Sequence, residues 1–217
     1  MKQTLVVLFL ASIPLLAGCG AMSKKQAQLS KGITLLEQGD YQQALADLRS
    51  LAHEGYAAGE NVLGAVYMGG VGVPRNYAKA DYWFRKAAGQ GDAQGENDLG
   101  LAYFHGKGVP RNYAKADYWF RKAAGQGDAQ GENDLGLAYF HGKGVPRNYA
   151  KADYWFRKAA DQEDASAEEN LSKSYSEGKG VPRNYAKAVY WAHKAVVQKA
   201  RLALKELDAI RHAETSP

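Results

Sequence analysis

The stretch RNYAKADYWFRKAAGQGDAQGENDLGLAYFHGKGVP occupies Arg75–Pro110 and occurs again, without a change, at Arg111–Pro146. The two start positions differ by 111 − 75 = 36 residues. The unit begins a third time at Arg147 and a fourth time at Arg183, with increasing divergence. A fixed period of this length is typical of solenoids and other repeat architectures. We therefore expect a tandem array rather than one or two compact domains.

Each unit is expected to form two helices. The first helix follows Asn76, a good N-cap residue, and its apolar residues recur at spacings of three and four. The second is expected to start near Ala93 and to end at the Gly106, Gly108 and Pro110 cluster. The apolar positions of the first helix are Tyr77, Ala80, Trp83, Phe84, Ala87 and Ala88, and those of the second are Leu99, Gly100 and Tyr103. Neither helix is long enough to be stable alone, so stacking must stabilise the array.

This unit resembles the Sel1-like repeat, a relative of the tetratricopeptide repeat. The resemblance covers about Gln42–Val197 and rests on two motifs. These are Leu99-Gly100-x-x-Tyr103-x-x-Gly106-x-Gly108-Val109 and Lys115-Ala116-x-x-Trp119-Phe120-x-Lys122-Ala123-Ala124-x-Gln126-Gly127. It implies an all-α fold, a right-handed superhelical solenoid of antiparallel helix pairs with a 36-residue period. It also implies that one helix of each pair lines a concave groove that binds protein.

A second face of the helix that starts near Ala93 supplies the candidate partner-binding residues. They fall at i, i+4, i+7 and i+8, opposite the packing face, and recur in the next repeat. The set is Asn61, Asn97, Leu101, Phe104, His105, Asn133, Leu137, Phe140 and His141. Such a ladder on the concave side would suit an extended peptide or a helix. The alternative is that Leu101 and Phe104 pack against a neighbouring helix, while Asn97 and His105 are expected to stay exposed.

The beginning of the chain has the pattern of an exported lipoprotein. Residues 1–18 form a short basic start, an apolar run and small residues, as in a signal peptide. Leu16-Ala17-Gly18-Cys19 matches the bacterial lipobox, and Cys19 is the only cysteine. The resemblance implies cleavage before Cys19, lipidation of its thiol, and an outer-membrane anchor facing the periplasm because Gly20, not Asp, follows. The alternative is an ordinary signal peptide with a chance cysteine.

The expected organisation divides the chain into five segments. They are a signal peptide at 1–18, the lipidated Cys19 with a short tether at 19–30, the repeat solenoid at 31–198, a capping helix at 199–213 and a tail at 214–217. The apolar side of the capping helix comprises Leu202, Leu204, Leu207 and Ile210. The last repeat becomes polar at Ser172, Lys173 and Ser176, as expected where no neighbour covers a terminal repeat.

Net charge, cysteine content and the number of apolar runs exclude several classes of protein. The net charge is +5, or 5 − 1 = +4 once Lys2 is removed with the signal, which is too mild to indicate a nucleic-acid protein. A single cysteine excludes an intramolecular disulfide and a thiolate-only metal cage. One long apolar run excludes a protein with many membrane spans.

Candidate chemistry is sparse, and we predict neither a cofactor nor a metal. His105 and His141 have no second ligand within a turn, so surface histidines are the simpler interpretation. Gly106-Lys107-Gly108 lacks the spacing and the hydroxyl residue of a phosphate loop. The carboxylates Asp81, Asp92, Glu96 and Asp98 have the same surroundings in each identical repeat, which argues against an acid and base pair with separated pKa values.

The sequence therefore predicts a monomeric, non-catalytic envelope lipoprotein that acts as a scaffold or adaptor for a protein or peptide partner. One alternative is a protein that binds peptidoglycan or polysaccharide, or a cell-wall hydrolase. Another is a secreted factor that interacts with a host.

Overall fold

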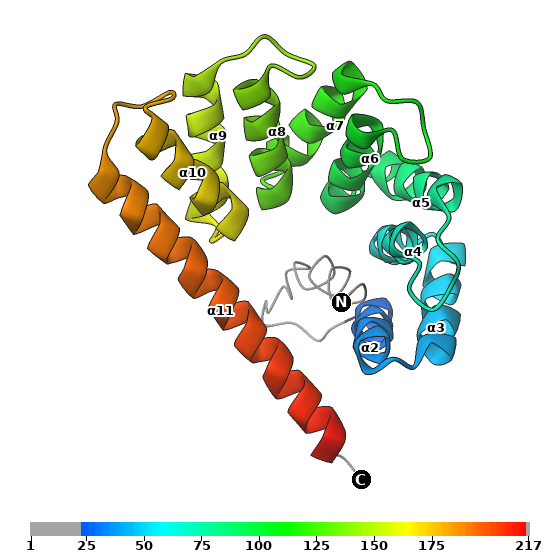
Figure 1. The fold of residues 1–217 in the computed structure, drawn as a ribbon. Helices are drawn as coiled ribbons and strands as arrows, with labels where there is room; N and C mark the ends of the chain where they lie inside the picture. Colours follow the sequence, from blue (N-terminus) through cyan, green and yellow to red (C-terminus); the bar gives the residue numbers. More distant parts are fainter. Residues whose placement is uncertain (1–22, 216–217) are drawn as a thin grey trace. The chain divides into compact units, whose positions relative to one another are not determined.

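The computed structural model describes residues 23–215, without the side chains of 205, 206 and 208–215. Over these residues the regular secondary structure is entirely helical, with ten helices joined by short loops and no strand (Figure 1). The helices fall into two units, divided after Arg111, which we describe separately. Unit 1 contains α2 (Lys24–Gln38), α3 (Tyr41–His53), α4 (Ala57–Gly69), α5 (Tyr77–Gly89) and α6 (Ala93–His105). Unit 2 contains α7 (Tyr113–Gly125), α8 (Ala129–His141), α9 (Tyr149–Asp161), α10 (Ala165–Glu177) and α11 (Tyr185–Thr215).

Local capping explains where the repeated helices begin and end. The Asn76 side chain accepts a hydrogen bond from the Lys79 backbone N–H (2.9 Å) and starts α5, as predicted. Asp92 caps α6 in the same way through the Gly95 N–H (2.7 Å). The α6 helix ends at Gly106, whose φ of 70° is the left-handed conformation that glycine adopts most easily. The predicted start of this helix at Ala93 is confirmed.

In the pairs α4–α5 and α8–α9, the two helices approach closely through a glycine and a phenylalanine. A Cβ atom added at Gly64 of α4 would lie 2.6 Å from the ring of Phe84 in α5, which is fully buried. Gly136 and Phe156 repeat this contact in unit 2 at the same distance. In the last pair both residues change together: Ser172 replaces the glycine, and Ala192 (156 + 36) replaces the phenylalanine. The small residues of the array thus leave room for the aromatic ones.

Contacts between successive pairs use a polar triad. Arg85 of α5 binds Asp81 (2.7 Å) and donates a hydrogen bond to the Tyr103 hydroxyl of α6 (2.8 Å). Asp81 and Arg85 lie four residues apart in the sequence, a spacing that by itself predicts a weak pair exposed on the side opposite the packing face. That prediction is wrong, because the Asp81 side chain is only 14% exposed and the pair joins one repeat to the next.

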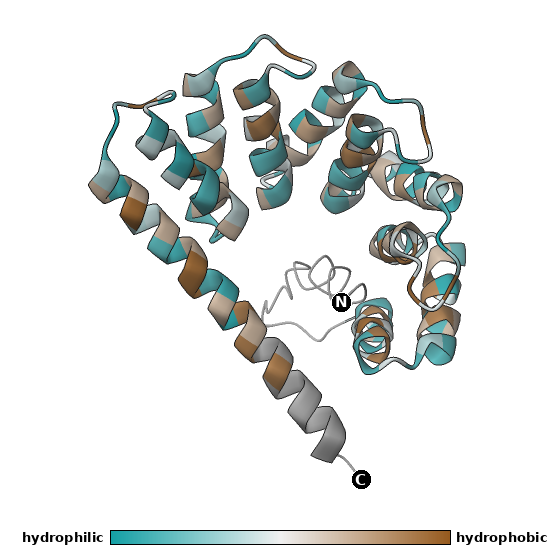
Figure 2. Ribbon diagram, viewed as in Figure 1, coloured by the Kyte–Doolittle hydropathy of each residue, from teal (hydrophilic) through white to brown (hydrophobic). Residues whose placement is uncertain are grey.

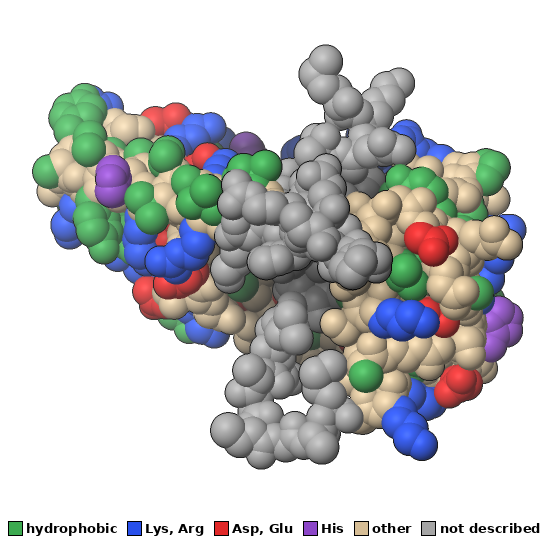
Figure 3. Space-filling model, turned by 90° about the horizontal axis from the view of Figure 1, so that it is seen from below, with side chains coloured by type: hydrophobic (Ala, Val, Ile, Leu, Met, Phe, Trp, Pro, Cys, Tyr) green, Lys and Arg blue, Asp and Glu red, His purple; other side chains and the backbone are tan. Residues whose placement is uncertain are grey.

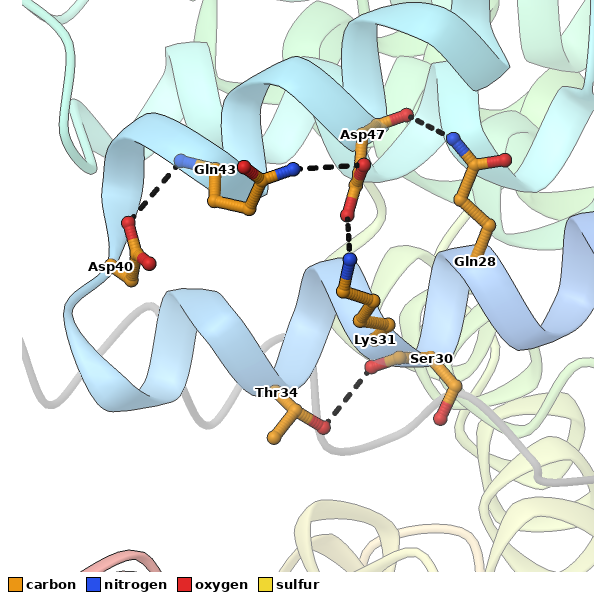
Figure 4. A network of polar contacts seen from close by, with 7 residues as sticks. All are labelled: Gln28, Ser30, Lys31, Thr34, Asp40, Gln43 and Asp47. Atoms are coloured by element: carbon orange, nitrogen blue, oxygen red, sulfur yellow. Dashed lines mark hydrogen bonds and ion pairs between the residues drawn. The ribbon is translucent and has the colours of Figure 1, made fainter.

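The first pair, α2 and α3, differs from the others. Asp47 stands where the repeats have tryptophan, and it binds Lys31 (3.3 Å) and Gln43 (3.3 Å) while its backbone carbonyl accepts from Gln28 (3.3 Å) (Figure 4). The α2 helix begins at Lys24, so residues 24–30 are helical and not part of a tether. The signal-peptide residues and Cys19 lie outside the described residues.

The α11 helix runs unbroken from Tyr185 to Thr215 (Figure 1). The predicted separate capping helix at 199–213 is therefore wrong. The glycines that end the equivalent helix at 89 and 91 are replaced, 108 residues later, by Val197 and Lys199, so nothing in the backbone stops the helix. Among the described residues, no helix is both long enough and apolar enough to cross a bilayer.

Candidate partner-binding surface

The asparagines of the predicted ladder do not face solvent. Asn61 is 6%, Asn97 1% and Asn133 7% exposed, so the expectation that Asn97 stays exposed is wrong. The reason is visible in unit 2, where the Nδ2 of Asn170 in α10 donates a hydrogen bond to the Oδ1 of Asn133 in α8 (2.9 Å). Asparagine at this position therefore faces the equivalent helix of the neighbouring repeat. These residues hold the array together and are poorly placed to contact a partner.

The remaining ladder residues keep different amounts of exposed surface. His105 and His141 are exposed at the ends of α6 and α8. Leu101, Leu137 and Phe104 are half-buried, which fits the alternative that Leu101 and Phe104 pack against neighbouring side chains. Phe140 is 8% exposed and contacts Tyr149 and Phe156 of α9 at ring-centroid distances of 5.1 and 6.3 Å.

In unit 2 the end of the ladder is surrounded by lysines. We call Phe140, His141, Lys143, Lys173 and Lys179 the Phe140 cluster. The ammonium groups of Lys173 and Lys179 lie 5.7 and 5.4 Å from the centre of the Phe140 ring, within the range of a cation–π contact. Desolvation, followed by the charges of the three lysines, lowers the pKa of His141 below its ordinary value. His141 is therefore neutral at pH 7, and the positive charge of the cluster comes from its lysines.

The chemistry of the Phe140 cluster suits an acidic ligand with an apolar side chain. Lys173 is exposed, and Lys179 forms an ion pair with Glu177 at 2.6 Å, a carboxylate whose pKa Lys173 also helps to lower. The half-buried Leu137 lies one turn before Phe140 on the same helix. A partner segment could place carboxylates against the lysines and an apolar residue against Leu137.

A second repeated feature was not predicted from the sequence. It is a buried glutamate held by a lysine and a glutamine of the same repeat, which we call the glutamate clasp. Glu132 of α8 is 1% exposed, and its two oxygens bind Lys158 of α9 (2.8 Å) and Gln162, the residue that caps the end of α9 (2.9 Å). The same clasp joins Glu60 to Lys86 and Gln90 in unit 1, at 2.8 and 2.6 Å. The sequence does contain a sign of it, because the same set of a glutamate, a lysine 26 residues later and a glutamine 30 residues later recurs with the 36-residue period. The clasp pairs the two helices of one repeat, so its role is structural.

A third repeated feature is an exposed tyrosine on each of α5, α7, α9 and α11. Tyr82, Tyr118, Tyr154 and Tyr190 are 55%, 56%, 56% and 58% exposed. Each ring meets the following tryptophan edge to face, for instance Tyr154 and Trp155 at 5.1 Å. On the face that Figure 3 shows, green hydrophobic and blue basic side chains lie side by side to the left of the grey residues. The molecule thus presents aromatic surface on helices other than those of the predicted ladder.

Two of the four carboxylates considered as candidates for catalysis have structural roles. Asp81 binds Arg85, and Asp92 caps α6. Burial raises the pKa of Asp92 against the effect of its hydrogen bond from Gly95. Across residues 23–215, the side chains that are described form no group of three His, Cys, Asp or Glu suited to a metal ion.

Comparison with known families identifies the repeat. The Sel1 repeat model matches residues 57–92, 93–128, 129–164 and 165–196, together more than half of the chain. The chain belongs to the Sel1 repeat family. The matched segments show that each Sel1 repeat consists of one pair, such as α4 with α5 or α8 with α9. Sel1 repeat proteins generally serve in protein–protein interaction.

Solved structures of related proteins support the same assignment. A protective antigen present in uropathogenic Escherichia coli strains, which displays an SLR fold, is 37% identical with a TM-score of 0.69; the match covers 91% of this chain and 41% of that one. A Sel1 repeat protein from Oxalobacter formigenes is 34% identical with a TM-score of 0.64, covering 77% and 69%. The fold is shared by a putative sel1 repeat protein from Klebsiella pneumoniae subsp. pneumoniae, which is 23% identical with a TM-score of 0.58. That match covers 86% of this chain and 93% of the other. A search of curated proteins gave no match.

Proposed function

We propose that this Sel1 repeat protein is a lipid-anchored adaptor of a bacterial envelope. In this proposal it binds a protein partner through the exposed face of the helices that carry the predicted ladder, α4, α6 and α8, which the tetratricopeptide likeness assigns to the concave side. Repeated helix pairs create extended surfaces of this kind without any catalytic group. The general interaction role of the family supports the proposal.

The observation that carries the proposal is the Phe140 cluster. It combines exposed cationic groups with a half-buried apolar side chain at the end of α8. The partner is expected to be a peptide segment or helix that carries both carboxylates and an apolar anchor. Binding should weaken with salt, because lysine–carboxylate contacts at an exposed site are screened.

Site-specific photocrosslinking in cells tests this assignment. A photoreactive amino acid at His141 should capture a partner, and the same probe at Tyr154 serves as a control because that residue is also exposed, on α9. In a second arm, Lys173→Glu should reduce capture at His141, while Lys151→Glu on α9 should not. Equal capture from both probe positions would contradict the proposed face.

The anchor is tested separately. Cys19→Ala should abolish palmitate labelling and move the protein from the membrane fraction to the soluble one, because the thiol is the proposed acceptor. Labelling that persists in Cys19→Ala would disprove the anchor without affecting the binding face.

The exposed tyrosines favour a second candidate function, binding of a cell-wall glycan. Sugar rings can stack on flat aromatic faces, and Tyr118, Tyr154 and Tyr190 recur along one unit at the same position of the repeat. Purified protein would then cosediment with isolated sacculi, and Tyr118→Ala with Tyr154→Ala would reduce the bound fraction. Absence of cosedimentation by the unaltered protein would reject this function.

The similarity to a protective antigen raises a third candidate, exposure at the cell surface. Protease added to intact cells would degrade a surface-exposed chain and leave a periplasmic one intact. Protection of this chain, with degradation of a known surface protein in the same sample, would exclude host contact by the anchored form.

A further inference from the structure

The cations of unit 2 occupy two different environments. Many of them bind carboxylates, as Lys158 binds Glu132 (2.8 Å) and Lys194 binds Glu168 (3.1 Å). Further pairs of this kind are Arg121–Asp117, Arg157–Asp153, Lys199–Glu169 and Arg201–Glu163. By contrast, no ion pair to any described residue is formed by Arg147, Lys151, Arg183 and Lys187.

These four exposed residues, which we call the basic edge, lie at one edge of unit 2. Arg147 and Arg183 belong to the loops that join α8 to α9 and α10 to α11. Lys151 and Lys187 lie in the first turns of the helices that follow these loops. Figure 1 shows both loops at the same edge of the unit and the turn between α9 and α10 at the opposite one. In Figure 2 both loops are largely teal, with a short brown stretch in each.

The sequence around the basic edge is poor in acidic residues. Residues 141–152 and 178–189 contain no Asp or Glu, and Glu177, just before the second stretch, already binds Lys179. At the opposite edge, residues 161–169 contain Asp161, Glu163, Asp164, Glu168 and Glu169. The net charge of +5 for the whole chain therefore conceals an uneven distribution within this unit. Segregated charge produces a local potential that attracts ligands of the opposite sign.

Aromatic rings hold the lysines of the basic edge without neutralising them. The Nζ of Lys151 lies 5.3 Å from the centre of the Tyr139 ring, and the Nζ of Lys187 lies 5.3 Å from that of Tyr175. A neutral ring attracts a cation through its quadrupole and leaves the positive charge available to a ligand. The repeat thus orders these side chains in advance, which reduces the entropy lost when an anion binds.

We propose that the basic edge docks on an anionic phospholipid surface. Each lysine or arginine near such a surface adds to the binding, and the contact requires charge but no pocket. In the two loops the valines are half-buried and the prolines exposed, so these loops offer no large apolar anchor of the kind that carries a tight protein contact. Tyr185, 65% exposed at the start of α11, is of a residue type enriched at the headgroup level of membranes.

The choice of a membrane over an acidic protein rests in part on the proposed lipid anchor, which would hold the chain within reach of headgroups. The contact itself requires no lipid on the protein. It can therefore be measured in a chain that carries Cys19→Ser, and its failure would leave the proposed anchor and the Phe140 cluster unaffected.

Cosedimentation of the full chain carrying Cys19→Ser with lipid vesicles tests the proposal. The vesicles contain phosphatidylcholine alone or an equimolar mixture with phosphatidylglycerol. Neutral vesicles measure any binding through the apolar run at residues 4–16, so the gain with anionic lipid reports the charged contact. This gain should disappear at high salt, because the contact lies at an exposed edge.

Charge reversal at the basic edge should remove the gain. Arg147→Glu with Arg183→Glu should reduce partition into anionic vesicles about tenfold or more, with helix content unchanged, and Lys151→Glu with Lys187→Glu should do the same. Lys24→Glu with Arg49→Glu is the matched control, because it makes the same change of net charge at exposed residues of unit 1. Equal losses from control and edge variants, or no preference of the unaltered edge for anionic vesicles, would overturn the proposal.

A fluorophore sensitive to its environment tests the orientation. Attached at Pro182→Cys in the Cys19→Ser chain, it should change its emission with anionic vesicles and not with neutral ones. Attached at Asp161→Cys, which is exposed at the opposite edge, it should not respond. Responses at both positions or at neither would overturn the proposed edge. Binding of soluble polyglutamate without a response to anionic vesicles would identify an acidic protein segment as the occupant and reject the membrane.

Discussion

At Gly136, the backbone of α8 packs directly against the ring of Phe156. A Cβ atom there would lie 2.6 Å from two ring carbons and 3.3 Å from the Ala152 carbonyl oxygen, and the Phe156 ring that would have to move is itself buried. Gly136→Ala is therefore expected to lower the free energy of unfolding by about 1–3 kcal/mol, although alanine favours the helix by about 1 kcal/mol. Chemical denaturation measured by circular dichroism checks this value.

Gly125 offers a matched control for that substitution. It ends α7 in the same unit, and a Cβ atom there would meet nothing within 4 Å. Gly125→Ala should therefore be neutral or stabilise by a few tenths up to about 1 kcal/mol. Equal effects at both positions would mean that the close contact with Phe156 does not limit residue size.

Asp164 provides a pH-dependent test at the same scale. Burial raises its pKa to about 6, against the hydrogen bond from Ala167 and with added repulsion from Asp128 and Glu168. An unfolded aspartate titrates near pH ~3.9, so between these values the folded state binds more protons and stability falls as pH rises. Asp164→Asn retains the capping oxygen and removes the charge. It should raise the free energy of unfolding at pH 7 by about 1–2 kcal/mol, with the gain disappearing near pH ~4.

Thermal unfolding of Asp164→Asn across that pH range measures the effect. Asp40→Asn is the control, because Asp40 caps α3 through the Gln43 N–H but is exposed. A gain for Asp164→Asn that is constant from pH 4 to pH 7 would show that the buried charge is not its cause.

At the scale of paired helices, the buried clasp sets the register between α8 and α9. The Glu132 carboxylate is almost fully buried, and Lys158 supplies its only charged partner among the contacts of the described residues. Lys158→Met would leave that charge unpaired. We expect a loss of about 2 kcal/mol in the free energy of unfolding, toward the low end for a buried pair because the Lys158 side chain is 42% exposed.

A double-mutant cycle isolates the charge from the packing. Glu132→Gln with Lys158→Met removes both charges and should recover part of the loss, since a neutral amide is less costly to bury. Urea denaturation of the four proteins gives the coupling energy. Additive effects of the two substitutions would indicate that the clasp contributes packing alone.

Helix boundaries could be predicted because their causes are local. Asn76 accepts from a backbone N–H three residues away, and Gly106 terminates α6 by its own backbone conformation. The burial of Asn97 and Glu132 could not be predicted, because it depends on side chains of other helices, such as Lys158, 26 residues after Glu132 (158 − 132). Periodicity within one helix identifies two faces but does not reveal what covers the second. The same limit applied to α11, whose apolar side was predicted as that of a short cap.

At the scale of the whole molecule, the array behaves as a series of similar interfaces and not as one core. The triad of Arg121, Asp117 and Tyr139 joins α7 to α8 with the same geometry as the triad of α5 and α6, 2.8 Å for each hydrogen bond. Stability in such arrays is approximately a sum of repeat and nearest-neighbour terms. The length of the chain is therefore adjustable in steps of one repeat.

Deletion of residues 111–146 tests this additivity directly. The join places Arg147 after Pro110, and because the sequence that follows Arg147 matches the one that followed Arg111, every new neighbour is of a type already present. The shortened protein should fold with the same helix content per residue and a single cooperative thermal transition, at a lower Tm because one interface is lost. Deletion of residues 93–110 alone, which removes one helix of a pair, is the control and should abolish cooperative unfolding. If both deletions collapse the transition equally, the repeats do not act as interchangeable units, and the nearest-neighbour account of this array fails.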